Sequence, residues 1–196
     1  VTRKLLDPML VKGLKPPASF RGELREYQKQ GLSWLGFLDS LQLGACLADD
    51  LGLGKTVQVL AFLSGIQKRK GTSLLIIPAS LIANWQSEIE RFAPRLKFFV
   101  AHPEAHREKG LRPPGKKELG RLDLVITTYA LVQRYEWLQD ASWDYVILDE
   151  AQAIKNPGTK QTRAVKKLKA KNRIILPGTP VENRLSDLWS LFDFLN

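Results

Sequence analysis

The sequence predicts an α/β fold in which a mainly parallel β-sheet carries helices on both faces. Short, continuous apolar runs of strand length recur along the chain, as they do in parallel strands that are buried on both faces. Segments with a helical spacing of apolar residues separate these runs, and this alternation is typical of repeated strand–helix units. A glycine-rich turn at residues 49–56 also joins one apolar run to one helical pattern.

The chain begins with an irregular segment that is followed by a helix. Residues 1–22 hold three prolines and two glycines, so we expect a lead-in without regular structure and place the folded domain at residues 23–196. Residues 23–41 repeat apolar side chains every three or four positions, which predicts a helix packed on the domain. Gln28 lies in this helix, and its amide could pair with both a donor and an acceptor, although most helical glutamines are simply solvated.

The later elements follow in alternation. We expect strands at residues 45–48, 74–77, 96–101, 124–129, 145–150 and 173–176. We expect helices after residue 56, from residue 80 to the proline at 94, within residues 155–173 and at residues 185–195. Residues 102–121 are rich in proline, glycine and charge, which predicts a mobile surface insertion. His102 and His106 have the spacing of a metal pair, but no third ligand is evident in the sequence.

Composition limits the class of protein. With 196 residues and 44% hydrophobic content, the chain can form one domain with a sizeable core. Cys46 is the single cysteine and lies in an apolar run, which favours a buried thiol in a reducing compartment and excludes an intramolecular disulfide. No apolar stretch approaches the roughly 20 residues that cross a bilayer, and no signal-peptide pattern is present. We therefore expect a soluble intracellular protein with no membrane partner.

The charge distribution is uneven. The formal net charge is +10, and residues 155–173 contain eight basic residues and no acidic one. Such a segment favours a polyanionic partner, although many basic runs are only solvated helix faces. Charge alone leaves both interpretations open.

The turn at residues 49–56 has the composition of a phosphate cradle. Glycines let backbone N–H groups close round an anion at the positive end of a helix. In this arrangement Lys55 reaches the β- and γ-phosphates of a nucleotide, and the Thr56 hydroxyl binds Mg²⁺. Asp49 occupies a position at which the strict pattern has glycine, so the turn is the shorter Gly-x-Gly-Lys-Thr form.

An acidic pair ends a later predicted strand. Ligands of parallel α/β sheets gather at the carboxyl ends of strands, so we expect Asp149 and Glu150 to lie near the glycine turn. Phosphoryl transfer needs an acid near the metal and a group that positions the attacking water. Asp149 suits the metal and Glu150 suits the water. Neighbouring strand residues point to opposite faces, so this division requires the backbone to turn between them.

Four motifs occur in order along the chain: Leu-Arg-Glu-Tyr-Gln at residues 24–28, Asp-Asp-Leu-Gly-Leu-Gly-Lys-Thr at 49–56, Asp-Glu-Ala-Gln at 149–152 and Gly-Thr-Pro at 178–180. Together they closely resemble the N-terminal RecA-like lobe of Swi/Snf family ATPases, which are superfamily-two, double-stranded-DNA translocases. The resemblance runs from about residue 24 to residue 196.

The resemblance implies roles for individual residues. The ATP site would comprise Gln28, Asp50, Gly52, Leu53, Gly54, Lys55 and Thr56, with Gln28 reading adenine. Thr56 and Asp149 would hold Mg²⁺, and Lys55, Asp149 and Glu150 would act in hydrolysis. The residues that couple nucleotide state to DNA would be Gln152, Gly178 and Thr179. DNA-backbone contacts would come from Ser80, Asn84, Trp85, Thr128 and Tyr129.

The resemblance also implies partners that the chain itself does not contain. Double-stranded DNA is the expected polyanion, and a second RecA-like lobe would supply arginines that complete the ATP site. Nothing in the sequence resembles that lobe, so the chain looks like an excised domain, which we expect to be monomeric and nearly inactive alone. Pro177 replaces the small hydroxyl residue usual in the family, which puts the local coupling geometry in question.

Two other interpretations of the sequence remain. One is a nucleotide-gated nucleic-acid-binding module that has lost turnover, and the other is an RNA helicase lobe. The four intact residues Lys55, Thr56, Asp149 and Glu150 argue against the first, and the Gly-Thr-Pro motif argues against the second. The resemblance favours a prokaryotic source, which would place the protein in the cytoplasm or nucleoid; a eukaryotic one would be nuclear.

Overall fold

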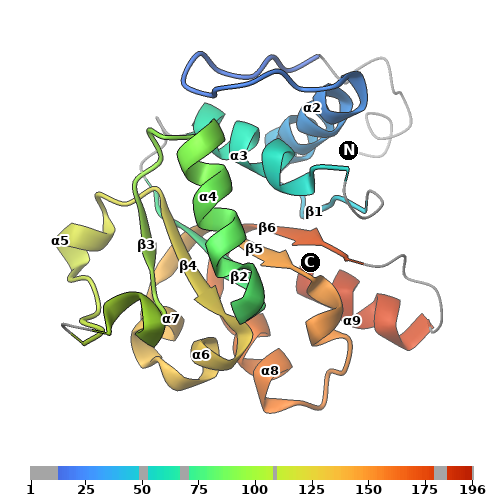
Figure 1. Ribbon diagram of the computed structural model, residues 1–196. Helices are drawn as coiled ribbons and strands as arrows, with labels where there is room; N and C mark the ends of the chain where they lie inside the picture. The colour runs from blue at the N-terminus through green and yellow to red at the C-terminus, as the bar shows by residue number, and fades with distance from the viewer. Residues whose placement is uncertain (1–12, 49–52, 67–70, 108–109, 179–184, 196) are drawn as a thin grey trace.

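The computed structural model describes residues 13–48, 53–66, 71–107, 110–178 and 185–195, and Figure 1 shows their arrangement. Six strands form one sheet in the order β1-β6-β5-β2-β4-β3, and every neighbouring pair is parallel. The strands are β1 (Ala45–Cys46), β2 (Ser73–Ile77), β3 (Phe98–Val100), β4 (Leu124–Thr128), β5 (Ser142–Asp149) and β6 (Lys169–Leu176). The predicted α/β class with a parallel sheet is therefore confirmed.

The described helices cover both faces of this sheet (Figure 1). The α-helices are α2 (Glu26–Ser40), α3 (Lys55–Ile66), α4 (Ile82–Phe92), α5 (Lys116–Leu119), α6 (Tyr129–Arg134), α7 (Glu136–Asp140), α8 (Lys160–Lys166) and α9 (Leu185–Leu195). Short 3-10 turns are η2 (Ala79–Leu81), η3 (Pro103–His106) and η4 (Ala151–Ile154). None of the described helices is both long and apolar enough to span a membrane.

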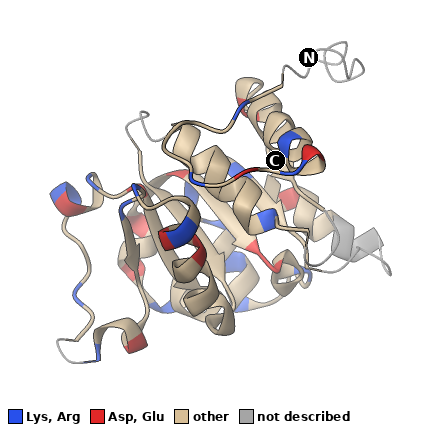
Figure 2. Cartoon of the chain, turned by 45° about the horizontal axis from the view of Figure 1, so that its top comes forward, with Lys and Arg blue, Asp and Glu red and all other residues tan. Residues whose placement is uncertain are grey.

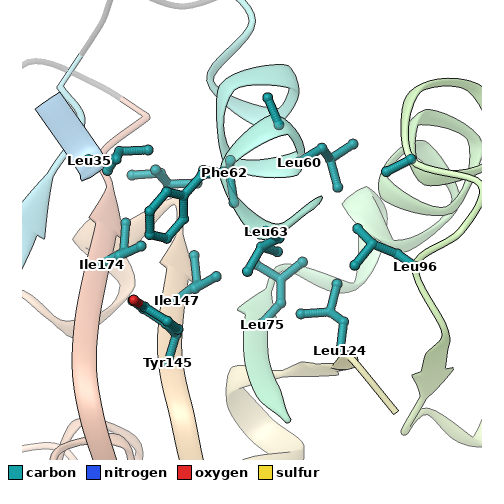
Figure 3. Packing of buried hydrophobic residues seen from close by; sticks show 14 of the residues in the cluster. Leu35, Leu60, Phe62, Leu63, Leu75, Leu96, Leu124, Tyr145, Ile147 and Ile174 are labelled. Carbon is teal, nitrogen blue, oxygen red and sulfur yellow. The ribbon is translucent and has the colours of Figure 1, made fainter. Parts of the chain in front are cut away.

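The core has two halves, one on each face of the sheet. Along β2, Leu75 and Ile77 belong to the half covered by α2, α3 and α4, whereas Leu74 and Ile76 belong to the half covered by α6 to α9. All four side chains are fully buried, because side chains alternate between the faces of a strand and both faces are covered. Figure 3 shows the first half, in which the Phe62 ring meets Tyr145 edge-on at 5.4 Å between centroids.

Two segments differ from the sequence-based expectation. Tyr129 does not end a strand but begins helix α6, and α6 and α7 occupy a stretch for which no helix was predicted. The basic segment is not one helix, because α8 ends at Lys166 and β6 begins at Lys169. Backbone pairing explains this difference: residues from Lys169 onward pair with β5 from Ser142 onward, and this ladder extends the strand beyond its apolar part.

The predicted insertion at residues 102–121 contains the short elements η3 and α5. Its histidines have local structural contacts. The His106 ring lies 2.8 Å from the Val100 carbonyl oxygen through Nε2 and packs on Phe99, and His102 Nδ1 accepts a hydrogen bond from the Glu104 backbone. No group of three potential metal-ligating residues occurs among the described residues.

Candidate active site

The strand order brings three predicted motifs to one edge of the sheet. β6 lies between β1 and β5, and all three strands run in the same direction. Lys55 begins the helix that follows β1, Gly178 follows the end of β6, and Asp149 ends β5. The carboxyl edge of a parallel sheet is the usual place for a ligand, because the loops after the strands meet there. This geometry unites segments that are far apart in the sequence.

The described part of the glycine turn is shaped by close packing. Gly54 has a φ of +75°, and a Cβ atom at this position would lie 2.5 Å from Gln28 Nε2. The backbone conformation therefore favours glycine, and a Cβ atom here would also displace the Gln28 amide from its contact with the turn. Lys55 and Thr56, both partly buried, form the first turn of α3, where helix N–H groups and the helix dipole favour an anion.

Four of the predicted nucleotide residues precede Lys55 in the glycine turn. Leu53 and Gly54 are described, whereas Asp50 and Gly52 lie outside the described residues.

Gln28 joins α2 to the glycine turn. Its side chain is buried, Oε1 accepts a hydrogen bond from the Arg25 backbone at 2.9 Å, and Nε2 donates to the Leu53 carbonyl at 3.1 Å. A side-chain amide has two N–H groups and two oxygen lone pairs, so one donor and one acceptor position remain for a ligand. The residue predicted to read adenine therefore also supports the turn that would bind phosphate.

Asp149 is held by three hydrogen bonds. The Trp85 indole N–H donates to Oδ2 at 2.8 Å, the Glu150 backbone N–H donates to Oδ1 at 3.0 Å, and the Tyr129 hydroxyl donates to the Asp149 carbonyl oxygen at 2.6 Å. Burial raises the pKa of Asp149, while the Trp85 and Glu150 hydrogen bonds and the charge of Lys55 oppose that rise. Burial also raises the pKa of Tyr129 well above its usual value, so the hydroxyl stays protonated and can donate.

Glu150 lies where the backbone turns away from the strand. Its φ of 51° and ψ of 50° are left-handed, which separates its side chain from that of Asp149. The Glu150 carboxylate accepts a hydrogen bond from Gln152 Nε2, and Gln152 Oε1 accepts one from the Gly178 backbone N–H at 3.1 Å. A non-glycine residue with positive φ is uncommon and costs energy. The two acids are thus directed to different positions, as their predicted roles require.

The link between Glu150 and Gly178 leaves no room for a side chain at residue 178. A Cβ atom there would lie 1.7 Å from Glu150 Oε2. Gln152 and Gly178 therefore contact the predicted hydrolytic residue directly. Thr179, the third predicted coupling residue, lies outside the described residues.

The predicted DNA-contact residues fall into two groups. Ser80 on η2 and Asn84 on α4 are exposed. Trp85, Thr128 and Tyr129 are buried, with only 1% of Trp85 exposed. Buried side chains do not favour direct contact with DNA, and the assignment of these three residues to DNA contacts stays a prediction. Trp85 and Tyr129 instead hold Asp149.

Glu88 is a site residue that the sequence analysis missed. It follows Trp85 by one helical turn on α4, and its Oε2 atom is buried without a hydrogen-bond partner among the described residues. Burial raises the pKa of Glu88, and the negative charge of Asp149 raises it further against the opposing effect of Arg91. The signal in the sequence was an acid on the buried face of an amphipathic helix, three residues after Trp85.

The donor atoms at this edge suit a magnesium nucleotide. A hydroxyl from Thr56 and a carboxylate from Asp149 are hard oxygen ligands of the kind that Mg²⁺ takes. Magnesium is usually held by one or two carboxylates together with substrate phosphates and water, rather than by a complete protein cage. A site with few protein ligands beside an anion-binding helix end therefore fits the metal together with a phosphate chain.

Comparison with known proteins gives consistent results. A family model described as the SNF2-related domain matches residues 27–196. YwqA of Bacillus subtilis is 46% identical over 186 residues, covering 93% of this chain and 20% of YwqA. The uncharacterized ATP-dependent helicase MG018 of Mycoplasma genitalium is 42% identical over 175 residues, covering 88% of this chain and 17% of MG018.

Solved structures are similar over nearly the whole chain. The Sulfolobus solfataricus SWI2/SNF2 ATPase core in complex with dsDNA matches with a TM-score of 0.84 and 44% identity, covering 94% of this chain and 38% of that one. A second structure, of the Sulfolobus solfataricus SWI2/SNF2 ATPase core domain, matches with a TM-score of 0.82 and 45% identity, covering 94% of this chain and 37% of that one. The chain thus spans about a fifth or less of these two relatives and somewhat over a third of the solved cores.

Proposed function

The chain belongs to the SNF2-related family, and from this membership we propose that it is the ATP-binding first lobe of a DNA-dependent ATPase that moves along double-stranded DNA. One observation carries the proposal: the ends of β1, β6 and β5 bring Lys55, Gly178 and Asp149 to one edge of a RecA-like sheet. This is the arrangement that ATP hydrolysis needs, because the phosphate-binding and hydrolytic groups must act on the same phosphate chain.

The residues of this edge divide the work. The N–H groups at the start of α3 and the Lys55 ammonium bind the β- and γ-phosphates, and the Gln28 amide contributes its remaining donor and acceptor to adenine. Thr56 and Asp149 hold Mg²⁺, which neutralises charge on the phosphates when bound. The Glu150 carboxylate accepts a hydrogen bond from the attacking water and orients it, while Gln152 fixes the position of that carboxylate.

DNA and a second lobe complete the proposed function. The similar Sulfolobus solfataricus core was solved with dsDNA, and Ser80 and Asn84 are exposed on the segment that the resemblance relates to the DNA backbone. A second RecA-like lobe of the parent protein supplies arginines to the phosphates, and such groups contribute about 10³–10⁵ in rate. We therefore place the lobe at residues 23–196 and expect near-background hydrolysis from it alone, with or without DNA.

Equilibrium titration with a fluorescent ATP analogue in the presence of Mg²⁺ tests the proposal. We expect weak binding, since the second lobe would enclose much of the nucleotide. Lys55→Ala should lower the affinity at least about 10-fold, because a hydrogen bond to a charged group contributes about 1.5–3 kcal/mol. Lys117→Ala, on the exposed helix α5, is the matched control and should bind as the wild type does. Equal affinity in Lys55→Ala and Lys117→Ala would exclude the phosphate-binding assignment.

A further inference from the structure

Trp85 has a contact that ordinary core packing does not require. A buried indole N–H needs an acceptor, and a backbone carbonyl is sufficient. Trp143, which is equally buried, donates to the Leu138 carbonyl at 3.0 Å. Trp85 instead donates at 2.8 Å to a side-chain carboxylate on β5, that of Asp149. The acceptor is thus the acid that the proposed function assigns to the metal.

The contact fixes the orientation of the carboxylate. Trp85 occupies one position on Oδ2, and the Glu150 backbone N–H occupies one on Oδ1. Two donors on different oxygens hold the plane of the group, and each oxygen keeps another lone pair for water or metal. Groups that orient a metal ligand in this way affect metal affinity without touching the metal.

Helix α4 connects this hydrogen bond to the exposed surface. Trp85 directly follows Asn84, which is exposed, and Ser80 lies on the preceding turn η2. The buried side of α4 packs in the same half of the core as α3, the helix that Lys55 begins. A shift of η2 and the first turn of α4 would therefore move the Trp85 indole relative to Asp149.

We propose that Trp85 is a positioning residue for magnesium: it holds the Asp149 carboxylate in its metal-binding orientation and links that carboxylate to the exposed residues Ser80 and Asn84. The proposal rests on the proposed function, since it takes Asp149 as the metal ligand. It assigns Trp85 a role in magnesium affinity and in the response of the site to DNA, whereas the family resemblance implied a direct DNA contact.

A magnesium titration tests the positioning role. The 196-residue chain is mixed with a fixed concentration of fluorescent ATP analogue, and Mg²⁺ is added until binding of the analogue saturates. Trp85→Phe keeps a buried ring but removes the N–H, and it should raise the Mg²⁺ midpoint about 10- to 100-fold, the usual effect of losing a group that orients a metal ligand. Binding of the analogue without Mg²⁺ should stay within about twofold of the wild type, because Lys55 and the helix N-terminus are untouched.

Trp143→Phe is the matched control, since it removes a buried indole hydrogen bond of similar length on the other half of the core. Its Mg²⁺ midpoint should equal that of the wild type. If Trp85→Phe and Trp143→Phe shift the midpoint equally, or neither shifts it, the positioning role is wrong. If Lys55→Ala binds as the wild type does, the proposed function itself fails, so the two failures are distinguishable.

Replacing Trp85 by benzothienylalanine, in which sulfur takes the place of the N–H at nearly constant shape, covers the case in which Trp85→Phe does not fold. It should reproduce the raised Mg²⁺ midpoint, and a normal midpoint would overturn the proposal.

Indole NMR tests the link to the surface without any activity measurement. The five tryptophans give one indole N–H signal each, and the Trp85 and Trp143 signals are assigned by their loss in the Phe variants. Adding a short DNA duplex to the wild type should shift the Trp85 signal and leave the Trp143 signal in place.

The same DNA should change the Mg²⁺ midpoint of the wild type and not that of Trp85→Phe, because coupling between two sites is reciprocal. If neither DNA effect occurs in the wild type at DNA concentrations at which the protein binds the duplex, the link between the exposed surface and Asp149 is wrong.

Discussion

Glu88 and Asp149 are two acids whose charge affects the pH dependence of stability. Glu88 is partly buried with Oε2 unpartnered among the described residues, and Asp149 is nearly fully buried. Burial raises the pKa of each, and the negative charge of Asp149 adds to the rise for Glu88. Two carboxylates that disfavour each other's charge destabilise the folded state when both are ionised.

Glu88→Gln should therefore stabilise the protein at neutral pH. The pKa of Glu88 is higher in the folded state than in the unfolded state. The contribution of Glu88 to the stability of the wild type is therefore fully present below the unfolded-state pKa and is lost as pH rises through the folded-state pKa. The neutral amide removes that loss. We expect a higher melting temperature than the wild type at pH 7.5, and the difference should narrow steadily toward pH 5.

Thermal unfolding by circular dichroism, without nucleotide, checks this expectation. Glu90→Gln is the matched control, because Glu90 is on the same helix but exposed. A difference for Glu88→Gln that widens toward low pH would contradict the sign of the effect.

At the scale of elements, the ends of β5 and β6 form one unit. Glu150 follows β5 and Gly178 follows β6, and Gln152 bonds to both. The contact continues the parallel pairing of the two strands, which reaches Asp149 and Leu176. A change at the end of β6 is therefore transmitted to Glu150 across the sheet.

Gly178→Ala should separate stability from catalysis. The added Cβ would meet the Glu150 carboxylate, the far end of a flexible side chain, so the carboxylate can move away at small cost in stability. In a protein that carries both lobes, we expect single-turnover ATP hydrolysis to slow at least about 100-fold, as expected for a displaced acid–base group. ATP affinity and melting temperature should change little.

The control for this substitution is Gly65→Ala, because a Cβ at Gly65 on α3 meets nothing within 4 Å. It should hydrolyse ATP at the normal rate and should be slightly more stable, since alanine is favoured over glycine in a helix. Normal turnover in Gly178→Ala would contradict the assigned role of Glu150.

The elements that sequence predicts well are those with a strong local pattern. β2 contains a continuous apolar run, and α4 combines helical spacing with a following proline, so the predicted positions agree with the structure to within about two residues. The basic segment was mispredicted because Lys169 and Lys171 carry no strand signal of their own. Their conformation depends on pairing with Ser142 and its neighbours, which lie far away in the sequence.

The candidate site also combines residues that the sequence identifies with contacts that only the fold reveals. Lys55, Asp149 and Glu150 stand in recognisable motifs, and the order of strands at a parallel sheet explains why they meet. Trp85 was assigned to the DNA contacts because the family resemblance implies such contacts for its segment. Only the three-dimensional structure shows that its indole reaches Asp149 across two elements.

At the scale of the whole molecule, the excess positive charge is partly neutralised or used inside the fold. Lys166 pairs with Asp193 and Lys171 with Asp144, while Arg173 donates to the Phe194 and Leu168 carbonyls. Figure 2 shows lysine and arginine spread over many elements with acidic residues between them. The positive charge of residues 155–173 is therefore less available to a polyanion than the sequence suggested.

DNA binding by this chain should accordingly be weak and independent of sequence. Phosphate contacts release counterions, so the logarithm of the affinity should fall linearly with the logarithm of salt concentration, with a slope of about −0.9 per phosphate contacted. Fluorescence anisotropy with two duplexes of equal length and unrelated sequence measures both properties. A slope near zero, or a strong preference for one duplex, would contradict backbone contact as the basis of binding.

The edge strand β1 has a consequence for how the protein is made. β1 has two residues, and both of its pairing partners are in β6, near the end of the chain. During synthesis the glycine turn and Lys55 emerge early. The strand that pairs with β1, the strand before this turn, is β6, and it emerges later. Such non-local pairing forms slowly, so we expect ATP to stabilise the nascent lobe only after β6 has been translated. Nucleotide binding would then report on completed folding rather than assist its first steps.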